Sequence, residues 1–530
     1  MRRMFAAMLW LACGCALAQS PVPGGVVYED ANGNGLRDAG ERGVAGAAVS
    51  NGRDVVRTDA GGRYALPMAP GQTIFVIKPA GWQAPDGADG LPAFWCQQPV
   101  ERSSGLRHGG LPAGSLQPQV DFGLRKADAA DADLEVLVFA DPQPKSHVDV
   151  DYYRRDIVEP LRGKTRAALG LTLGDIVDDD LSLYPDIKAV TASLRVPWLH
   201  VAGNHDMDID AKDDADALQT FRHHFGPDTF AWEEARATFV LLDDVIHQPE
   251  AKPAYVGGFR DDQFAFLEAY LPTVPKDRLL VLGVHIPLFE PAGRDTFRDA
   301  DRERLFALLR HFPHVLVLSA HSHTQQHRFH DANTGWHGAQ PLHEYNVGAS
   351  CGAFWSGVKD ADGIPDSTMA DGTPNGHATL EVSEDGRYAL AWHPARLPDD
   401  DPTITEAMAL HAPKVLRRGA YPAWGVYANV FMGRDDTRAE YRVDDGDWKP
   451  MAKVSQPDPR LLVENMRDDL ADALRGYDRS PEAKPSTHLW RGALPTDLPV
   501  GGHRVEVRAF DAWQGEQRAS TTYRLQEAEE

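Results

Sequence analysis

A short apolar run leads into a series of carboxylates at Leu171-Thr172-Leu173-Gly174-Asp175-Ile176-Val177-Asp178-Asp179. The same arrangement occurs earlier, where the stretch 134–140, apolar except for Glu135, is followed by Asp141-Pro142-Gln143. Short apolar runs that end in turn-forming residues are typical of buried strands. The loops at the carboxyl ends of such strands form the binding sites of α/β folds. These two junctions therefore predict an α/β domain with a polar site at one edge of its sheets.

Three later apolar runs also end in side chains that can bind a metal. These runs, each with the residues that follow it, are 198–201 with Asn204-His205, 279–284 with His285, and 315–319 with His321 and His323. Carboxylate, amide oxygen and imidazole together suit divalent Mn, Fe or Zn. Any one of these residues alone is more simply a helix cap or a packed histidine. Because five successive strand ends carry them, we predict one metal site where the five ends meet.

The chain divides into three regions with different patterns. Residues 19–125 are rich in Gly and Pro and carry frequent turn signals, which predicts a small β-sandwich. Residues 133–396 alternate strand-like and helix-like segments, as expected for a layered α/β domain. Helices are expected there over 152–161, 262–271 and 301–310. Residues 400–530 return to β patterns, and an immunoglobulin- or fibronectin-like sandwich is the simplest interpretation.

Composition limits the class of protein. Of the 530 residues, 42% are hydrophobic and 25% charged, which excludes a collagen-like or largely disordered chain. The formal net charge is −24, and an acidic surface repels phosphate backbones, so we expect no basic face that binds nucleic acid. No apolar stretch reaches the roughly 18 residues that a membrane-spanning helix needs. The sequence does not predict the oligomeric state.

The N-terminus predicts export. A basic start at Met1-Arg2-Arg3, an apolar run over 5–17 and the exit Ala16-Leu17-Ala18 form a signal peptide over residues 1–18. A lipid anchor in this segment is less favoured. We therefore expect a periplasmic or secreted protein. Of its four cysteines only Cys96 and Cys351 follow this segment, and in an oxidising compartment they either pair or remain free thiols.

The ordered motifs resemble the calcineurin-like metallophosphoesterase superfamily. The resemblance covers residues 133–396, and its most specific pieces are Gly174-Asp175-Ile176-Val177-Asp178 and Gly203-Asn204-His205-Asp206. The segments His285-Ile286-Pro287-Leu288 and 371–376 look like an exported bacterial subgroup with N- and C-terminal β domains. The resemblance implies an α/β core built as an αββα sandwich, flanked by two small all-β sandwich domains.

This chain departs from the superfamily signature at two positions. Gln143 stands where the signature has a histidine, and Ala320 stands where it has a glycine. An amide oxygen can still bind a metal, although more weakly than imidazole. An alanine at position 320 costs little unless the backbone there needs a positive φ.

By resemblance, the chain is an exported phosphoesterase that hydrolyses phosphomonoesters or phosphodiesters with a hydroxide bridging two divalent metals. Asp175 would bridge the two metals, with Asp141, Gln143 and His323 completing one site and Asn204, His285 and His321 completing the other. His205 would be the general acid. Asp206 is a second candidate catalytic residue, in a supporting role that it would share with Asp178, although both could simply cap loops. The implied partner is a small phosphorylated substrate or a phosphoprotein.

A second candidate cation site lies in the N-terminal region. The stretch Asp30-Ala31-Asn32-Gly33-Asn34-Gly35-Leu36-Arg37-Asp38-Ala39-Gly40-Glu41 fits the spacing of a calcium loop. Its expected ligands are Asp30, Asn32, Asn34, Leu36, Asp38 and Glu41. A structural Ca²⁺ is the favoured interpretation, and a metal-free hairpin is the alternative.

Two other functions remain open from the sequence. Gly348-Ala349-Ser350-Cys351-Gly352 matches the elbow motif of serine hydrolases, with Ser350 as nucleophile. The plainer interpretations are a tight loop, or an apolar wall in which Phe354 and Trp355 lie beside the metals. A protein with an idle metal centre that binds a surface through Ca²⁺ is the non-enzymatic alternative.

Overall fold

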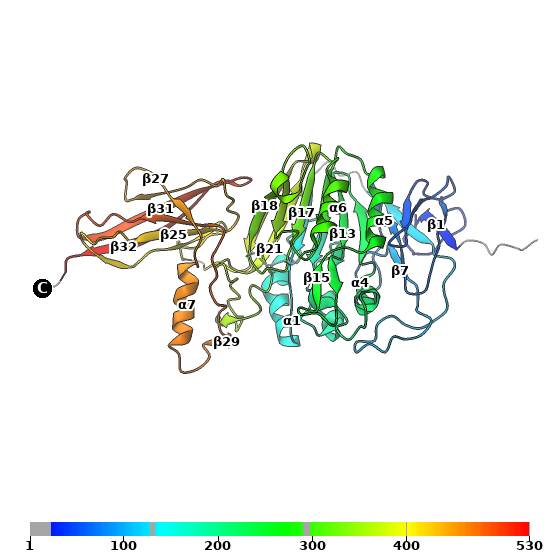
Figure 1. The fold of residues 1–530 in the computed structure, drawn as a ribbon, viewed down its shortest axis with the longest axis horizontal. Helices are drawn as coiled ribbons and strands as arrows, with labels where there is room; N and C mark the ends of the chain where they lie inside the picture. Colours follow the sequence, from blue (N-terminus) through cyan, green and yellow to red (C-terminus); the bar gives the residue numbers. More distant parts are fainter. Residues whose placement is uncertain (1–22, 128–132, 290–296, 399, 529–530) are drawn as a thin grey trace, which may run out of the picture.

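A computed structural model describes residues 23–127, 133–289, 297–398 and 400–528. The signal peptide expected over 1–18 lies outside these residues, as does most of the polar, Ala- and Asp-rich stretch 126–132, which the sequence predicts to be a linker between the first two regions. The three regions follow one another along the longest axis of the molecule, with the α/β region in the middle (Figure 1). No helix in the described part of the chain is long and apolar enough to cross a membrane.

The central region contains two mixed sheets. The first has the strand order β11 (Trp198–Val201), β10 (Leu169–Leu173), β9 (Leu134–Phe139), β21 (Gly376–Val382), β22 (Tyr388–Pro394). The second has the order β12 (Thr229–Glu233), β13 (Ala237–Leu242), β16 (Leu279–Gly283), β17 (Val315–Ser319), β19 (Leu342–Asn346), β18 (Gln326–His330). The sheets face each other, since a methyl group placed at Gly283 would lie 3.5 Å from Leu173 and 3.7 Å from Val201.

Helices cover the outer faces of both sheets and complete an αββα sandwich. α1 (His147–Tyr153) lies beside the first sheet and α5 (Asp261–Tyr270) and α6 (Asp299–Leu309) lie beside the second (Figure 1). α2 (Glu159–Leu161) follows α1 in the chain, and α3 (Tyr184–Ala192) packs next to α1. Tyr153 of α1 packs edge-on against Phe139 of β9 and shares a hydrogen bond with Thr191 of α3. The short helix α4 (Gln219–Phe225) packs Phe225 against Tyr184.

The helix expected over 152–161 begins five residues earlier than predicted. Ser146 caps it by accepting a hydrogen bond from the Asp149 N–H, so α1 starts at His147. The chain then continues through a π-helical turn, Arg154–Val158, into α2. The two other expected helices match α5 and α6 to within two residues.

The N-terminal region forms two four-stranded sheets. Their orders are β4 (Arg63–Ala65), β1 (Gly24–Glu29), β8 (Phe122–Lys126), β6 (Trp82–Gln83), and β3 (Val55–Arg57), β2 (Ala48–Ser50), β5 (Thr73–Ile77), β7 (Trp95–Gln97). This region shares one apolar core with the central region. Phe75 contacts Phe230 and Phe266, and the buried Lys78 forms an ion pair with Glu234 at 2.6 Å.

The C-terminal region has a separate apolar core between its own two sheets. Their orders are β23 (Met408–His411), β25 (Gly425–Val430), β30 (Leu489–Ala493), β28 (Ala452–Val454), and β24 (Val415–Arg417), β32 (Gly515–Gln526), β31 (Gly501–Asp511), β26 (Ala439–Val443), β27 (Lys449–Pro450). An insertion with α7 (Pro459–Asp469) ends in β29 (Gly476–Asp478). That strand pairs with β20 (Gly357–Val358) of the central region, so this insertion reaches back toward the loops of the α/β core.

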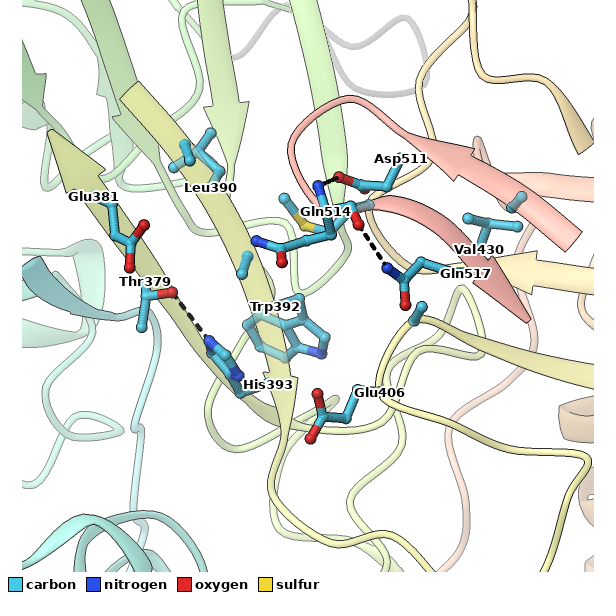
Figure 2. A pocket seen from close by; sticks show the side chains of 15 residues that line it. Thr379, Glu381, Leu390, Trp392, His393, Glu406, Val430, Asp511, Gln514 and Gln517 are labelled. Carbon is cyan, nitrogen blue, oxygen red and sulfur yellow. Dashed lines mark hydrogen bonds between the residues drawn. The ribbon is translucent and has the colours of Figure 1, made fainter. Parts of the chain in front are cut away.

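A cavity of about 250 Å³ lies between the central and C-terminal regions. Figure 2 shows Trp392 and His393 of β22 on one side and Gln514 and Gln517 of the β31–β32 hairpin on the other. None of the site residues predicted from the sequence lines this cavity.

Candidate metal centre

The side chains predicted to bind metal converge at the carboxyl ends of five parallel strands. β9 leads to Asp141 and Gln143, β10 to Asp175, β11 to Asn204, β16 to His285, and β17 to His321 and His323. Two clusters result, in each of which three ligand atoms, one from each side chain, lie within 4.8 Å of one another. The first cluster consists of Asp175, His285 and His321, and the second consists of Asp141, Asp175 and His323. Asp175 therefore belongs to both clusters.

The two predicted amide ligands also reach the centre. The Asn204 Oδ1 lies 3.1 Å from the His285 Nε2, and that nitrogen lies 3.3 Å from the Asp175 Oδ1. Gln143 donates through its Nε2 to Asp178 at 3.2 Å, while its Oε1 is buried and has no hydrogen-bond partner among the residues that the structure describes. A buried oxygen without a partner costs free energy, so the Gln143 carbonyl is available to a cation.

Backbone carbonyls orient two of the imidazoles. The His285 Nδ1 lies 2.8 Å from the Leu173 carbonyl oxygen, and the His323 Nδ1 lies 2.7 Å from the Gly352 carbonyl oxygen. Each Nδ1 therefore carries the proton and donates it to the carbonyl. The Nε2 of each ring faces the carboxylates, 3.3 Å from the Asp175 Oδ1 in His285 and 3.7 Å from the Asp141 Oδ1 in His323, and it is the nitrogen left to bind a metal. Such partners fix both the tautomer and the direction of a ligating histidine.

The turns after the strands have a strained backbone. Five of the seven predicted ligands adopt positive φ angles, namely Asp141 (45°), Gln143 (42°), Asp175 (47°), His321 (67°) and His323 (50°). Such strain persists only where the surrounding structure enforces it, and it concentrates at functional sites. Ala320 is not among the positive-φ residues, so alanine is compatible with the backbone where the signature has glycine.

Two glycines let these turns approach each other closely. A methyl group placed at Gly174, where φ is 87°, would lie 2.5 Å from the His285 ring. One placed at Gly203 would lie 2.3 Å from both the backbone nitrogen and the Oδ1 of Asp175. Any side chain at either position would therefore displace a predicted ligand.

Burial and close packing shift the pKa values of the clustered groups. Burial raises the pKa of Asp141 to about 8, reinforced by the charge of Asp175 and opposed by His285. Burial alone would raise the pKa of Asp175, but the charge and hydrogen bond of His285, together with the charges of His205 and His321, lower it. Burial and the neighbouring His285 lower the pKa of His321 to about 3. These opposed shifts arise where several ligands are packed without solvent between them.

His205 lies at the rim of the centre and is held by two carboxylates. Its Nδ1 lies 2.8 Å from the Asp179 Oδ1 and 3.2 Å from the Asp178 Oδ1, and its backbone N–H donates to Asp175. Burial alone would lower the pKa of His205, but the hydrogen bond that its ring donates to Asp179 and the charges of the nearby carboxylates raise it to about 9. Asp179 was not predicted as a site residue, although it follows Asp178 directly in the quoted motif.

Asp206 caps the turns on either side of the centre. Its carboxylate accepts hydrogen bonds from the Gly203 and Ile176 N–H groups and from the Tyr184 hydroxyl. These contacts are those of a loop-capping residue, which is the simpler role that the sequence also allowed for Asp206. Asp244 plays a similar part that the sequence did not single out, because its Oδ1 accepts from the His285 N–H at 3.0 Å. Its position two residues after β13 is the one feature of the sequence that could have marked Asp244 as a site residue.

The serine-hydrolase elbow lies beside the centre but lacks the parts of a triad. Ser350 is fully buried, and within the described residues its Oγ has no hydrogen-bond partner, so no base is placed to activate it. The loop instead supports the metal ligands. The Cys351 N–H donates to the Asp141 carbonyl, and Gly352 holds His323. In the part of the chain that the structure describes, Cys351 and Cys96 are free thiols.

The predicted apolar wall has one exposed member and one buried member. The Phe354 ring lies 5.1 Å from the His323 ring between centroids and is 40% exposed. Trp355 is buried and donates through its Nε1 to the Pro142 carbonyl at 2.9 Å. Of these two aromatic residues, Phe354 is therefore the one exposed to a molecule bound at the centre.

The predicted calcium loop is closed by hydrogen bonds among its own residues. Asp30 accepts from the N–H groups of Gly33, Asn34 and Gly35. The Asn32 and Asn34 amides donate to Asp38, and Glu41 accepts from the Ala31 and Asp38 N–H groups. Leu36 is exposed. The structure thus brings the predicted ligands into one loop.

Three family models match the chain in the order of its three regions. The model described as calcineurin-like phosphoesterase matches residues 134–325. The N terminal of calcineurin-like phosphoesterase matches residues 31–105, and the C terminal of calcineurin-like phosphoesterase matches residues 344–516. The matches span most of the chain.

Similar proteins cover parts of the chain. A probable cyclic nucleotide phosphodiesterase of Rhodopseudomonas palustris is 32% identical over 125 residues, which are 22% of this chain and 42% of that protein. The chain thus spans less than half the length of this relative. A purple acid phosphatase from yellow lupin (Lupinus luteus) covers 66% of this chain and 67% of its own, at 12% identity and a TM-score of 0.37. The match to GAP50 of Plasmodium covers 50% of this chain and 86% of GAP50, at 14% identity and a TM-score of 0.31. TM-scores this low carry no functional information.

Proposed function

Because this chain belongs to the calcineurin-like phosphoesterase family, we propose that it is an exported hydrolase of phosphomonoesters or phosphodiesters with a dinuclear metal centre. The observation that carries this proposal is the position of Asp175, which belongs to two ligand clusters at once. A shared carboxylate suits two divalent cations side by side, the arrangement that clamps a phosphoryl group in hydrolysis.

The residues present fit such a pair of cations. Asp141, Gln143 and His323 would complete one site and Asn204, His285 and His321 the other. The mixture of carboxylate, amide oxygen and imidazole suits Mn, Fe or Zn, and the unpaired Oε1 of Gln143 supports its role as a ligand. When bound, the cations lower the pKa of a coordinated water and neutralise the phosphoryl oxygens, which lets an acidic protein accept an anionic ester.

His205 is proposed to protonate the leaving oxygen. Asp179 and Asp178 occupy its Nδ1, so its Nε2 is the atom left to hold the proton that is transferred. The carboxylates favour the protonated ring, which an acid needs before the step, and any bound cation nearby would oppose them. Asp206 acts through position, because its hydrogen bonds to Gly203 and Ile176 hold the turns that carry Asn204 and Asp175.

A metal-exchange assay tests this function. The purified protein is stripped with chelator, reloaded with Mn²⁺, Zn²⁺ or Fe²⁺, and assayed with 4-nitrophenyl phosphate and bis(4-nitrophenyl) phosphate. Turnover that vanishes on stripping and returns with metal is expected, and Ser350→Ala should leave it unchanged. Metal-independent ester cleavage that Ser350→Ala abolishes would support the serine-hydrolase alternative instead. A folded protein without turnover in any metal would support the idle, surface-binding alternative.

Two further proposals concern the N-terminal part of the chain. The signal peptide over residues 1–18 directs the protein to the periplasm or the outside of the cell, as its basic start and small-residue exit indicate. The loop Asp30–Glu41 binds a structural Ca²⁺, as the spacing of its oxygen-bearing residues indicates. N-terminal sequencing of the exported protein tests the first proposal, and thermal unfolding with Ca²⁺ tests the second.

A further inference from the structure

One aromatic residue projects from a buried loop beside the metal centre. Cys351, Gly352, Trp355 and Ser356 are all buried, whereas Phe354 is 40% exposed. The loop is anchored on both sides of it, by the Gly352 carbonyl bonded to His323 and by the Trp355 indole bonded to Pro142. The exposure of Phe354 is therefore imposed by the loop and does not come from a mobile segment.

The backbone of Phe354 is also strained. Its φ is 68°, in the left-handed region that a bulky side chain without special polar contacts rarely adopts. A glycine would occupy this conformation without strain. Keeping an exposed phenylalanine here lowers the stability of the folded state, and the ring is tilted against that of His323, with 5.1 Å between the two ring centroids. Such strain next to ligands indicates a functional constraint.

A lysine from another part of the chain meets this ring. The Lys145 ammonium lies 4.2 Å from the centroid of the Phe354 ring and 3.5 Å from the Asp178 Oδ2. Its side chain is about half exposed. Asp178 in turn contacts Gln143 and His205, so this ammonium stands on the side of the centre where the leaving group is protonated in the proposed function. Within the described residues Lys145 has no closer carboxylate partner.

We propose that Lys145 and Phe354 form a subsite for the leaving group of the substrate, and that this group is aromatic and carries a negative charge. The ring offers apolar contact to a flat leaving group, and aromatic pairs gain affinity beyond the area that they bury. The ammonium offers a charge-assisted hydrogen bond to an anionic substituent. This inference rests on the proposed function, which leaves the substrate open between classes of phosphoester.

Binding and turnover with matched ligands test this subsite. Phenylphosphonate and cyclohexylphosphonate are titrated into the metal-loaded protein by calorimetry, because neither is hydrolysed and both present the same phosphonate. Phenyl phosphate, cyclohexyl phosphate and 4-carboxyphenyl phosphate are compared as substrates. The wild type is expected to bind phenylphosphonate more tightly than cyclohexylphosphonate. Its kcat/KM is expected to be higher for phenyl phosphate than for cyclohexyl phosphate, and higher still for 4-carboxyphenyl phosphate.

Phe354→Gly separates function from folding. It should weaken phenylphosphonate binding and raise KM for phenyl phosphate about five- to tenfold, change cyclohexyl ligands less than twofold, and leave Tm and metal content equal to or above the wild type. Phe329→Ala, which removes a ring of similar exposure on β18, is the matched control and should change neither preference. An equal loss for both ligand types, or no loss, would overturn the subsite.

Lys145→Met tests the charge. It should remove the preference for 4-carboxyphenyl phosphate, a change of about two- to fivefold in kcat/KM, and keep the preference for phenyl over cyclohexyl. A retained carboxylate preference contradicts the role of Lys145. The phosphonate titrations also separate the subsite from the proposed hydrolase activity. A protein without turnover that still prefers phenylphosphonate would refute the hydrolase and support the subsite. A protein with turnover but no preference for aromatic ligands would support the hydrolase and refute the subsite.

Discussion

The two stretches predicted to bind cations differ in how their oxygens are held. In the metal centre the ligands come from five strand ends, are mostly buried, and include a Gln143 oxygen without a partner. In the loop Asp30–Glu41 the ligands come from one stretch of twelve residues, are mostly exposed, and accept hydrogen bonds from neighbouring N–H groups. The loop can keep its shape without an ion, whereas the centre holds unpaired and opposed groups that a cation would relieve.

This difference predicts that cations contribute to function in the first site and to stability in the second. Ligands brought together from distant segments create a site whose chemistry depends on all of them. A loop already closed by its own hydrogen bonds gains only the binding free energy of its ion. The four changes below test this contrast in order of expected effect.

Asp175→Ala should have the largest effect. It removes the carboxylate shared by both clusters, so metal content should fall in both positions and turnover should approach background, a loss on the order of the 10⁶-fold acceleration that enzymes commonly reach. Elemental analysis measures the metal, and steady-state assays measure turnover. Full metal occupancy in the variant would show that Asp175 does not join the two positions.

His205→Ala should cost less and should spare the metals. We expect kcat to fall by about 10² to 10⁴, with the metal content of the wild type, because His205 lies at the rim and contacts Asp179 and Asp178. The loss should shrink for 4-nitrophenyl esters, whose leaving oxygen needs little help from an acid. Asp179→Asn is the matched control and should give a smaller fall in the same direction. Equal losses for good and poor leaving groups would remove the acid role.

Much of this centre could be predicted because apolar runs mark buried parallel strands. β9, β10, β11, β16 and β17 were expected to within about two residues, and the predicted ligands lie in the loop that follows each of them. The edge strands β12 and β18 were not expected. The sequence of β18, Gln326-His327-Arg328-Phe329-His330, has no apolar run, since it pairs on one side only.

The supporting residues were harder to predict because their partners are distant in sequence. Asp244 holds His285 from a loop 41 residues away, and Gly352 holds His323 through a carbonyl that every residue possesses. Lys145 meets Phe354 across more than two hundred residues. No local pattern distinguishes such contacts from ordinary loops, whereas ligands of the centre could be recognised by residue type and by position after a strand.

Gln143→Leu tests whether the unpaired oxygen is reserved for a cation. Loss of this ligand should weaken one metal by about tenfold or more, the scale on which even supporting partners matter. Without metal, the variant should be at least as stable as the wild type, because leucine buries no amide oxygen that lacks a partner. Metal titrations and thermal unfolding in chelator measure the two effects. A metal-free variant that is clearly less stable would mean that this oxygen is satisfied in the folded protein.

Calcium should have the smallest effect, confined to stability. Extracellular calcium modules bind with dissociation constants of about 10⁻⁴ to 10⁻³ M, so 5 mM Ca²⁺, a chosen concentration, should stabilise the protein by about 1–2 kcal/mol and raise Tm by a few degrees. Turnover should stay within about twofold once the centre is loaded. Glu41→Gln should abolish the Ca²⁺-dependent gain, measured against its own Tm in chelator because Glu41 also accepts loop hydrogen bonds. If Mg²⁺ raised Tm as much as Ca²⁺, or if Ca²⁺ still raised the Tm of Glu41→Gln, the stabilisation would not come from calcium bound in this loop. The hydrogen bonds within Asp30–Glu41 would then be the whole reason for the shape of the loop.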